Sequence, residues 1–261
     1  MTITTLRDKS RIESILRRNT RLHLYEIGDL DDFFWPDTKW YARDVAEPKA
    51  VALLYTAPAL PVLVGLSEQP DDELRELLAL LADRLPAHVY GHLSGNLVEI
   101  LKRRYSTESH GVHIRLCLTD ASQLARVDIS AVVQLTTADL PELRAFYDES
   151  YPGNWFEPRM LETGCYFGIR ERGELLSVAG VHVYSARYRV AALGNVTTNP
   201  DFRGRGLAAA TCARLCFALL ETCDDIGLNV NVGNAAAIAC YRKLGFTPFA
   251  MFEEFDLASQ V

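Results

Sequence analysis

The sequence predicts an α/β protein built from two similar halves. Segments with the apolar pattern of β-strands, such as AVALLYT and PVLVGLS, alternate with segments of helical spacing, such as DDELRELLALLADRLP. The order strand, strand, strand, long helix, strand, short helix, strand is expected over residues 38–118 and again over 165–257. The long helices should begin near Asp71 and Gly206, about 135 residues apart, and this offset indicates an internal repeat.

Other elements follow from local signals. The apolar segment LHLYEIG is expected to be a strand. DLPELRAFYDES is expected to be a helix in which Asp139 is the N-cap, Pro141 lies in the first turn and Glu142 completes a capping box. The pattern breaks over residues 119–130, which predicts a domain boundary there.

Composition and charge exclude several classes of protein. The net charge of −7 argues against nucleic acid as the main partner, and 49% apolar residues suffice for a substantial core. The charged N-terminus resembles no secretory signal and no apolar run is long enough for a membrane span, so a cytoplasmic protein is expected. The six cysteines form no CxxC pair or Cys/His cluster, which predicts buried free thiols and no metal site.

The segment GNVTTNPDFRGRGLAAA, residues 194–210, has the properties of an anion-binding turn. At the start of a helix the backbone N–H groups are unpaired and the helix dipole is positive. Gly204 and Gly206 lack a Cβ, so a phosphate can approach these N–H groups closely, and Arg203 and Arg205 add positive charge. The alternative is a tight turn into a core helix of small residues.

Two other phosphate-binding motifs do not fit. GxxxxGK[ST] is absent, which excludes a P-loop. GRGLAA does satisfy the dinucleotide pattern G-x-G-x-x-A, but that fold also needs an acidic residue at the end of the next strand, and this strand ends in NVGN. A nicotinamide cofactor is therefore not expected.

Two motifs in order resemble the GNAT acetyltransferase superfamily. The first is R-x-x-G-x-A after a strand ending in VTTNPDF, and the second is NAAAIACYRKLGF, which is similar to the family pattern N-x-x-A-x-x-x-Y-x-K-L-G-F. The resemblance covers residues 131–257 and is greatest to the glycine N-acyltransferase-like branch, whose members have a degenerate N-terminal GNAT half. It implies two tandem GNAT-like halves, each a mixed, mostly antiparallel sheet flanked by helices.

The resemblance also implies where acetyl-CoA binds. Backbone amides of the arginine-glycine turn would bind the pyrophosphate, and the strand before it would pair with the pantetheine arm between two parallel strands that splay apart, ending near Thr198 and Val232. The cofactor-binding residues expected in this way are Val196, Thr197, Thr198, Arg203, Gly204, Arg205, Gly206, Leu207, Ala208, Asn234 and Tyr241.

The catalytic residues implied are Tyr241 and His182. By resemblance Tyr241 would protonate the departing thiolate; alternatively it is a core tyrosine that packs the helix against the sheet. Many superfamily members have a glutamate base on the strand before the turn, but VAALGNVTT has none. His182 is a candidate base or a core histidine, and the loop YPGNWF would shape an acceptor pocket or plug the sheet.

The sequence therefore predicts an N-acetyltransferase that transfers an acetyl or short acyl group from acetyl-CoA directly to the primary amine of a small molecule. Residues 1–125 are expected to form a degenerate GNAT-like domain, because LSEQPDDELRE replaces the turn there, and residues 131–261 the catalytic domain. The alternative is an acyl-CoA-binding sensor or scaffold with little turnover. Transfer to an alcohol or to a protein N-terminus also remains open.

Overall fold

The computed structural model describes residues 2–68 and 70–260, and these fall into two compact units. The first unit comprises Met1–Arg115, Asn231–Gly233 and Phe249–Val261. The second unit comprises Leu116–Val230 and Asn234–Pro248.

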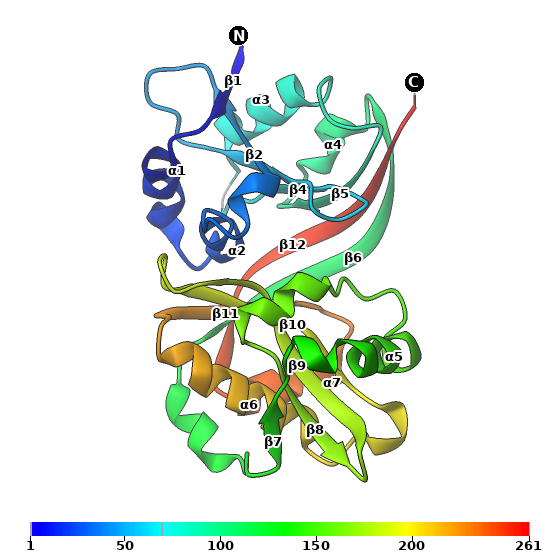
Figure 1. The fold of residues 1–261 in the computed structure, drawn as a ribbon. Coiled ribbons are helices and arrows are strands. Elements are labelled where there is room, and N and C mark those ends of the chain that lie inside the picture. Colours follow the sequence, from blue (N-terminus) through cyan, green and yellow to red (C-terminus); the bar gives the residue numbers. More distant parts are fainter. Residues whose placement is uncertain (1, 69, 261) are drawn as a thin grey trace. The chain divides into compact units, whose positions relative to one another are not determined.

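The strands of the first unit lie in the order β1-β2-β3-β4-β5-β12-β6 (Figure 1). Their bounds are β1 Ile3–Leu6, β2 Thr38–Arg43, β3 Ala52–Tyr55, β4 Val62–Gly65, β5 His88–Leu93, β6 Tyr105–Leu118 and β12 Phe246–Ser259. Neighbours from β1 to β4 are antiparallel, β4 and β5 are parallel, and β5 and β12 are antiparallel. The helices are α1 Lys9–Leu16, α2 Leu24–Gly28, α3 Asp72–Leu81 and α4 Val98–Leu101, with 3-10 turns at Arg17–Asn19 and Trp35–Asp37.

The strands of the second unit lie in the order β11-β10-β9-β8-β7. Their bounds are β7 Val132–Gln134, β8 Phe167–Glu171, β9 Glu174–Ser185, β10 Val190–Thr198 and β11 Asp225–Asn231. Neighbours from β7 to β10 are antiparallel, whereas β10 and β11 are parallel. The helices are α5 Leu140–Ser150, α6 Leu207–Leu220 and α7 Ala235–Lys243, and 3-10 turns occur at Ala121–Arg126, Thr137–Asp139, Pro158–Thr163 and Pro200–Phe202.

The internal repeat expected from the sequence is confirmed by this topology. In both units three antiparallel pairings lead to a parallel pair, with α3 between β4 and β5 and α6 between β10 and β11. The domain limits differ from those expected at 125 and 131. The last strand, β12, pairs with β5, and Phe249–Val261 belong to the first unit (Figure 1). Local sequence specifies that a strand forms but not its distant partner.

Helices α5 and α6 cover opposite faces of β10. Successive strand residues point to opposite faces of a sheet. Thr197 Oγ1 donates to the backbone carbonyl of Ser150 in α5 at 3.5 Å, whereas Thr198 Oγ1 lies 2.9 Å from Ser177 Oγ, which in turn lies 3.5 Å from Thr211 Oγ1 in α6. Buried hydroxyls therefore tie the end of β10 to both helical layers.

One segment expected to be a strand is a helix. LHLYEIG contains α2, in which Leu24 and Ile27 are buried at a spacing of three. Nδ1 of His23 lies 2.9 Å from a carboxylate oxygen of Glu26, one helical turn away. The strand prediction was wrong because a short apolar run fits either structure, and the contacts that decide between them are tertiary.

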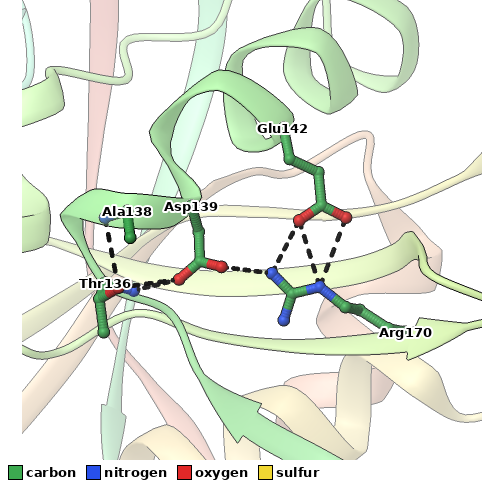
Figure 2. Close-up of polar contacts among 5 residues, drawn as sticks. All are labelled: Thr136, Ala138, Asp139, Glu142 and Arg170. Carbon is green, nitrogen blue, oxygen red and sulfur yellow. Dashed lines mark hydrogen bonds and ion pairs between the residues drawn. The ribbon is translucent and has the colours of Figure 1, made fainter.

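The start of α5 differs from the expected capping box (Figure 2). A 3-10 turn, Thr137–Asp139, precedes the helix, and Thr136 is its N-cap. Asp139 accepts from the backbone N–H of Thr136 at 2.7 Å, so Asp139 is the acid of the box. Glu142 instead binds Arg170, at 2.7 Å, and Arg170 also contacts Asp139 at 2.7 Å. Asp139 is the N-cap residue of α5 by position and Pro141 lies in its first turn, as expected, but the expected capping box with Glu142 is wrong because the Asp139 side chain caps the preceding turn.

Within residues 2–68 and 70–260, no helix is both long and apolar enough to cross a membrane.

Candidate functional site

The two parallel strands of the second unit separate before they end. Pairing of β10 with β11 runs from Val190 opposite Asp225 to Leu193 opposite Leu228. Beyond that pair β10 continues to Thr198 and β11 to Asn231. The sequence-based expectation of two splayed strands in this region agrees with this geometry, which leaves one edge of β10 without a paired strand over its last residues.

Backbone groups of alternate residues in β10 point toward this open edge. The N–H of Asn199 donates to the carbonyl of Leu176, on the β9 side, at 2.9 Å, and Thr197 pairs with β9 in the same direction. Because backbone direction alternates along a regular strand, Thr198 directs its backbone groups to the opposite edge. Nε of Arg203 donates to the carbonyl of Thr198 at 3.3 Å, consistent with this direction. Of the three strand residues expected to bind the cofactor, Thr198 therefore presents backbone groups at the open edge and Thr197 does not, while Val196 lies where the pairing with β9 is interrupted.

The turn between β10 and α6 is open to solvent. Gly204 and Gly206 have φ values of 77° and 80°, in the left-handed region that favours glycine. A Cβ on either residue would find no atom within 4 Å, so open space lies in front of the backbone. These glycines therefore leave room for a ligand against the main chain.

Helix α6 begins without a side-chain cap. Its N-cap is Gly206, and no side chain accepts a hydrogen bond from the first turn. Thr211 Oγ1 instead donates to the carbonyls of Leu207 and Ala208, at 3.2 and 3.1 Å, and holds the turn from the buried side. The N–H groups of the first turn and the positive end of the helix dipole thus face the open turn.

The two arginines of the turn have different contacts. Arg203 folds back onto the carbonyl of Thr198, where it stabilises the turn. The guanidinium of Arg205 lies 3.7 Å from the carboxylate of Glu171 and 5.3 Å from the ring centre of Phe202, and its side chain is half exposed. Glu171 was not predicted from the sequence, because it lies in a strand that is distant along the chain.

The corresponding region of the first unit lacks these features. Asp71 caps α3, and its carboxylate accepts from the N–H groups of Glu73 and Leu74 at 2.9 and 3.0 Å. Every residue of β4 pairs with β5, and beyond them the N–H of Ser94 donates to the carbonyl of Gly65 at 3.1 Å. A carboxylate therefore occupies the helix start, and the two parallel strands stay together.

Helix α7 carries the second motif. Asn234 is its N-cap, and its side chain accepts from the N–H of Ala237 at 3.1 Å. Tyr241 is 8% exposed, and its ring meets that of Phe246 edge-on at 5.9 Å. Asn234 is thus exposed at the helix start, while Tyr241 packs on the sheet.

His182 lies on the surface of the sheet, not in the core. It is the extra residue of a bulge in β9, since Val183 pairs with Ala192 but Val181 with Leu193. The side chain is exposed, and its ring occupies the space where a Cβ on Gly194 would lie. Gly194 follows the last residue paired with β11, so His182 lies beside the point where the strands separate.

Aromatic side chains occupy the α5 face near this point. The ring of Phe156 lies between those of Tyr147, at 5.0 Å, and Tyr166, at 5.6 Å. Trp155 is 43% exposed. Phe156 of the loop YPGNWF therefore packs over the sheet, and a role of the exposed Trp155 in shaping an acceptor pocket stays a prediction.

Five of the six cysteines are buried and Cys240 is partly exposed. Burial raises the pKa of Cys165 to about 12, so this thiol is protonated and unreactive at neutral pH. Within the described part of the chain, no group of three or more His, Cys, Asp or Glu side chains is arranged to hold a metal ion.

The chain is similar to known proteins in part of its sequence and in its fold. Residues 129–246 match the model of the acetyltransferase (GNAT) family. No curated protein matches the chain in sequence. The fold resembles that of a Drosophila protein, with a TM-score of 0.73, 11% identity and coverage of 98% of each chain.

Two further solved structures carry the GNAT name. A GCN5-related N-acetyltransferase from Sphaerobacter thermophilus has a TM-score of 0.62 and 12% identity, with 98% of this chain and 94% of that chain covered. A tandem GNAT protein from the clavulanic acid biosynthesis pathway, without acetyl-CoA, has a TM-score of 0.60 and 13% identity over 99% and 98% of the two chains. The chain therefore has the fold of two tandem GNAT-like halves, and its residues 129–246, which carry the splayed strands and the arginine-glycine turn, match the GNAT acetyltransferase family.

Proposed function

We propose that the second unit binds acetyl-CoA and transfers its acetyl, or another short acyl group, to a primary amine of a small molecule. The observation that carries this proposal is that the open edge at the end of β10 leads, through one short turn, to the uncapped start of α6. A pyrophosphate needs backbone N–H donors and a pantetheine arm needs an unpaired strand edge, and the second unit offers both.

The residues present fit this ligand. The N–H groups of residues 205–208 would bind the pyrophosphate, with Arg205 exchanging Glu171 for a phosphate oxygen. The backbone groups of Val196 and Thr198 would pair with the amides of the pantetheine arm. Asn234, exposed at the start of α7, would add a hydrogen bond while it remains a cap.

The bound thioester would supply an activated acyl carbonyl, and the chain's own groups would act around it. The N–H of Val196 would donate to the carbonyl oxygen, on which negative charge develops as the amine attacks. His182 would accept the proton that the amine loses. Tyr241 would donate its phenolic proton to the sulfur as the C–S bond breaks. Direct attack requires only that both reactants be held in place.

The first unit is proposed to be the degenerate half, as in the glycine N-acyltransferase-like branch. The carboxylate of Asp71 already occupies the helix N–H groups and would repel a phosphate. The paired ends of β4 and β5 leave no strand edge for a pantetheine arm. Its role would be structural.

Two observations favour the alternative, an acyl-CoA-binding sensor or scaffold with little turnover. Tyr241 is almost fully buried against Phe246, and β10 carries no glutamate that would serve as a base. The two functions share the cofactor and differ only in the chemical step.

The test is calorimetric titration with acetyl-CoA, followed by assay of thiol release with a panel of small primary amines. Micromolar binding together with amine-dependent thiol release supports the acetyltransferase. Tyr241→Phe should then lower kcat by at least about 100-fold while the Kd for acetyl-CoA is unchanged. Binding without release by any amine favours the sensor, and absence of binding contradicts both.

A further inference from the structure

Asn195 has an unusual backbone conformation within β10. Its φ is 52°, in the left-handed region, yet it is only 4% exposed. The other described non-glycine residues with positive φ, Arg172 and Arg189, lie in exposed positions. A left-handed residue inside a strand is unfavourable and persists only where its surroundings hold it.

Two tyrosine hydroxyls hold Asn195. Tyr147 of α5 donates its hydroxyl to the backbone carbonyl of Asn195 at 2.7 Å. The side-chain amide of Asn195 donates to the hydroxyl of Tyr166 at 3.1 Å, and that hydroxyl donates to the carbonyl of Val181 at 3.2 Å. Burial raises the pKa of both tyrosines, so each hydroxyl keeps its proton over the working pH range.

Packing fixes the position of both hydroxyls. Phe156 packs against both tyrosine rings, and a Cβ on Gly180 would overlap the ring of Tyr166. The glycine therefore provides the room in which Tyr166 lies over the sheet. The hydrogen bonds to Asn195 are made from rings with little freedom to move.

The conformation of Asn195 decides where the next residues point. Pairing of β10 with β9 shifts between Gly194 and Thr197, so the strand bulges at Asn195 and Val196. A bulge re-aims the backbone that follows it. After the bulge Thr197 pairs with Val178 of β9, whereas Asn195 and Val196 lie outside the paired register.

We propose that Tyr147 and Tyr166 are positioning residues for acyl transfer, which hold Asn195 left-handed and thereby aim the N–H of Val196 at the thioester carbonyl. The inference rests on the proposed function and deepens it. Neither tyrosine touches the reacting atoms, and both act through Asn195. Their loss should affect polarisation of the carbonyl more than binding of the pyrophosphate, which depends on the turn at Gly206.

The test compares Tyr147→Phe and Tyr166→Phe, which remove only the hydroxyls, with Tyr184→Phe as a matched control. Tyr184 lies in β9, and its hydroxyl is 3.1 Å from Thr222 Oγ1, so the control also loses a tyrosine hydrogen bond in the second unit. The readout is the infrared absorption of the thioester carbonyl in bound, isotopically labelled acetyl-CoA, together with its Kd and with kcat for an accepted amine.

Wild type and Tyr184→Phe should both show a carbonyl absorption below that of free acetyl-CoA. In Tyr147→Phe and Tyr166→Phe the absorption should return toward the free value, kcat should fall by about tenfold or more, and the Kd should change by less than about threefold. A carbonyl absorption that stays at the wild-type position, together with an unchanged kcat, in both variants would overturn the proposal. So would an equal loss of affinity in all three variants.

Repeating the test in an Asn195→Gly variant separates an effect on the position of the strand backbone from an effect on overall stability. Asn195→Gly adopts the left-handed conformation unaided, so it should retain the shifted absorption. Adding Tyr166→Phe to Asn195→Gly should then have no further effect, and an additive loss would contradict action through Asn195. If wild type shows no bound absorption at all, the proposed function fails, and the positioning role falls with it.

Discussion

Substitution of Gly206 tests the arginine-glycine turn most directly. The backbone at Gly206 has φ of 80°, and a Cβ there would meet nothing within 4 Å. Gly206→Ala and Gly206→Glu should therefore share the same conformational cost, about 1–2 kcal/mol for a left-handed L-residue. For a chain of this size that cost lowers Tm by roughly 2–8 °C and leaves the protein folded.

The two variants should differ in affinity for CoA. A carboxylate about 5 Å from a phosphate charge costs about 3 kcal/mol at an effective dielectric constant of about 20, which corresponds to more than a 100-fold loss of affinity. Alanine adds no charge and should weaken binding much less. The difference between them should shrink at high salt, because the site is exposed and the repulsion is screened.

For both variants, CoA affinity is measured by calorimetric titration and Tm by thermal unfolding. Gly95→Glu is the control, because Gly95 also has positive φ and open space around it, but lies in the first unit. It should lose a similar amount of Tm and retain CoA affinity. Equal CoA affinities for Gly206→Ala and Gly206→Glu, both folded, would refute binding of the pyrophosphate at this turn.

Three further predictions concern charged groups. The backbone N–H of Thr136 donates to the carboxylate of Asp139 and holds the pKa of that carboxyl below its ordinary value. The stabilisation from this carboxylate is therefore present above about pH 4 and is lost as the pH falls through the lowered pKa. In Asp139→Asn the unfolding free energy, measured with urea, should depend less on pH across that range. Asp71→Ala should lower the unfolding free energy by about 1 kcal/mol through loss of a helix cap, with no change in CoA affinity by calorimetry. Glu171→Gln should release Arg205 for phosphate and raise CoA affinity about two- to fivefold, the range expected for loss of a competing surface ion pair, and unchanged or weaker binding would contradict that competition.

Much of the fold was predictable because its signals are local. The long helix α3 was expected near Asp71, and the structure has Asp71 as its N-cap with buried leucines at helical spacing. The repeat was readable from the order of elements alone. The open turn follows from Gly204 and Gly206, on either side of Arg205, whose conformational freedom needs no distant partner.

The predictions were wrong where contacts between residues distant in the sequence decide the local structure. LHLYEIG contains the helix α2, and the capping box at Thr136 belongs to the 3-10 turn before α5, because neither short segment specifies its structure alone. His182 was considered as a core histidine, but a bulge in β9 turns it outward over Gly194. Register shifts depend on the pairing of two strands, and a sequence pattern of period two does not reveal them.

The two halves, the turn with its glycines and arginines, and the helix capped by Asn234 could be predicted from the sequence, since each depends on the backbone preferences of neighbouring residues. The pairing of β12 with β5, the contact between Glu171 and Arg205, and the hydrogen bonds of two tyrosine hydroxyls to Asn195 are visible only in the folded chain. These features join residues far apart in the chain, and packing and hydrogen-bond satisfaction, which select them, are properties of the assembled fold.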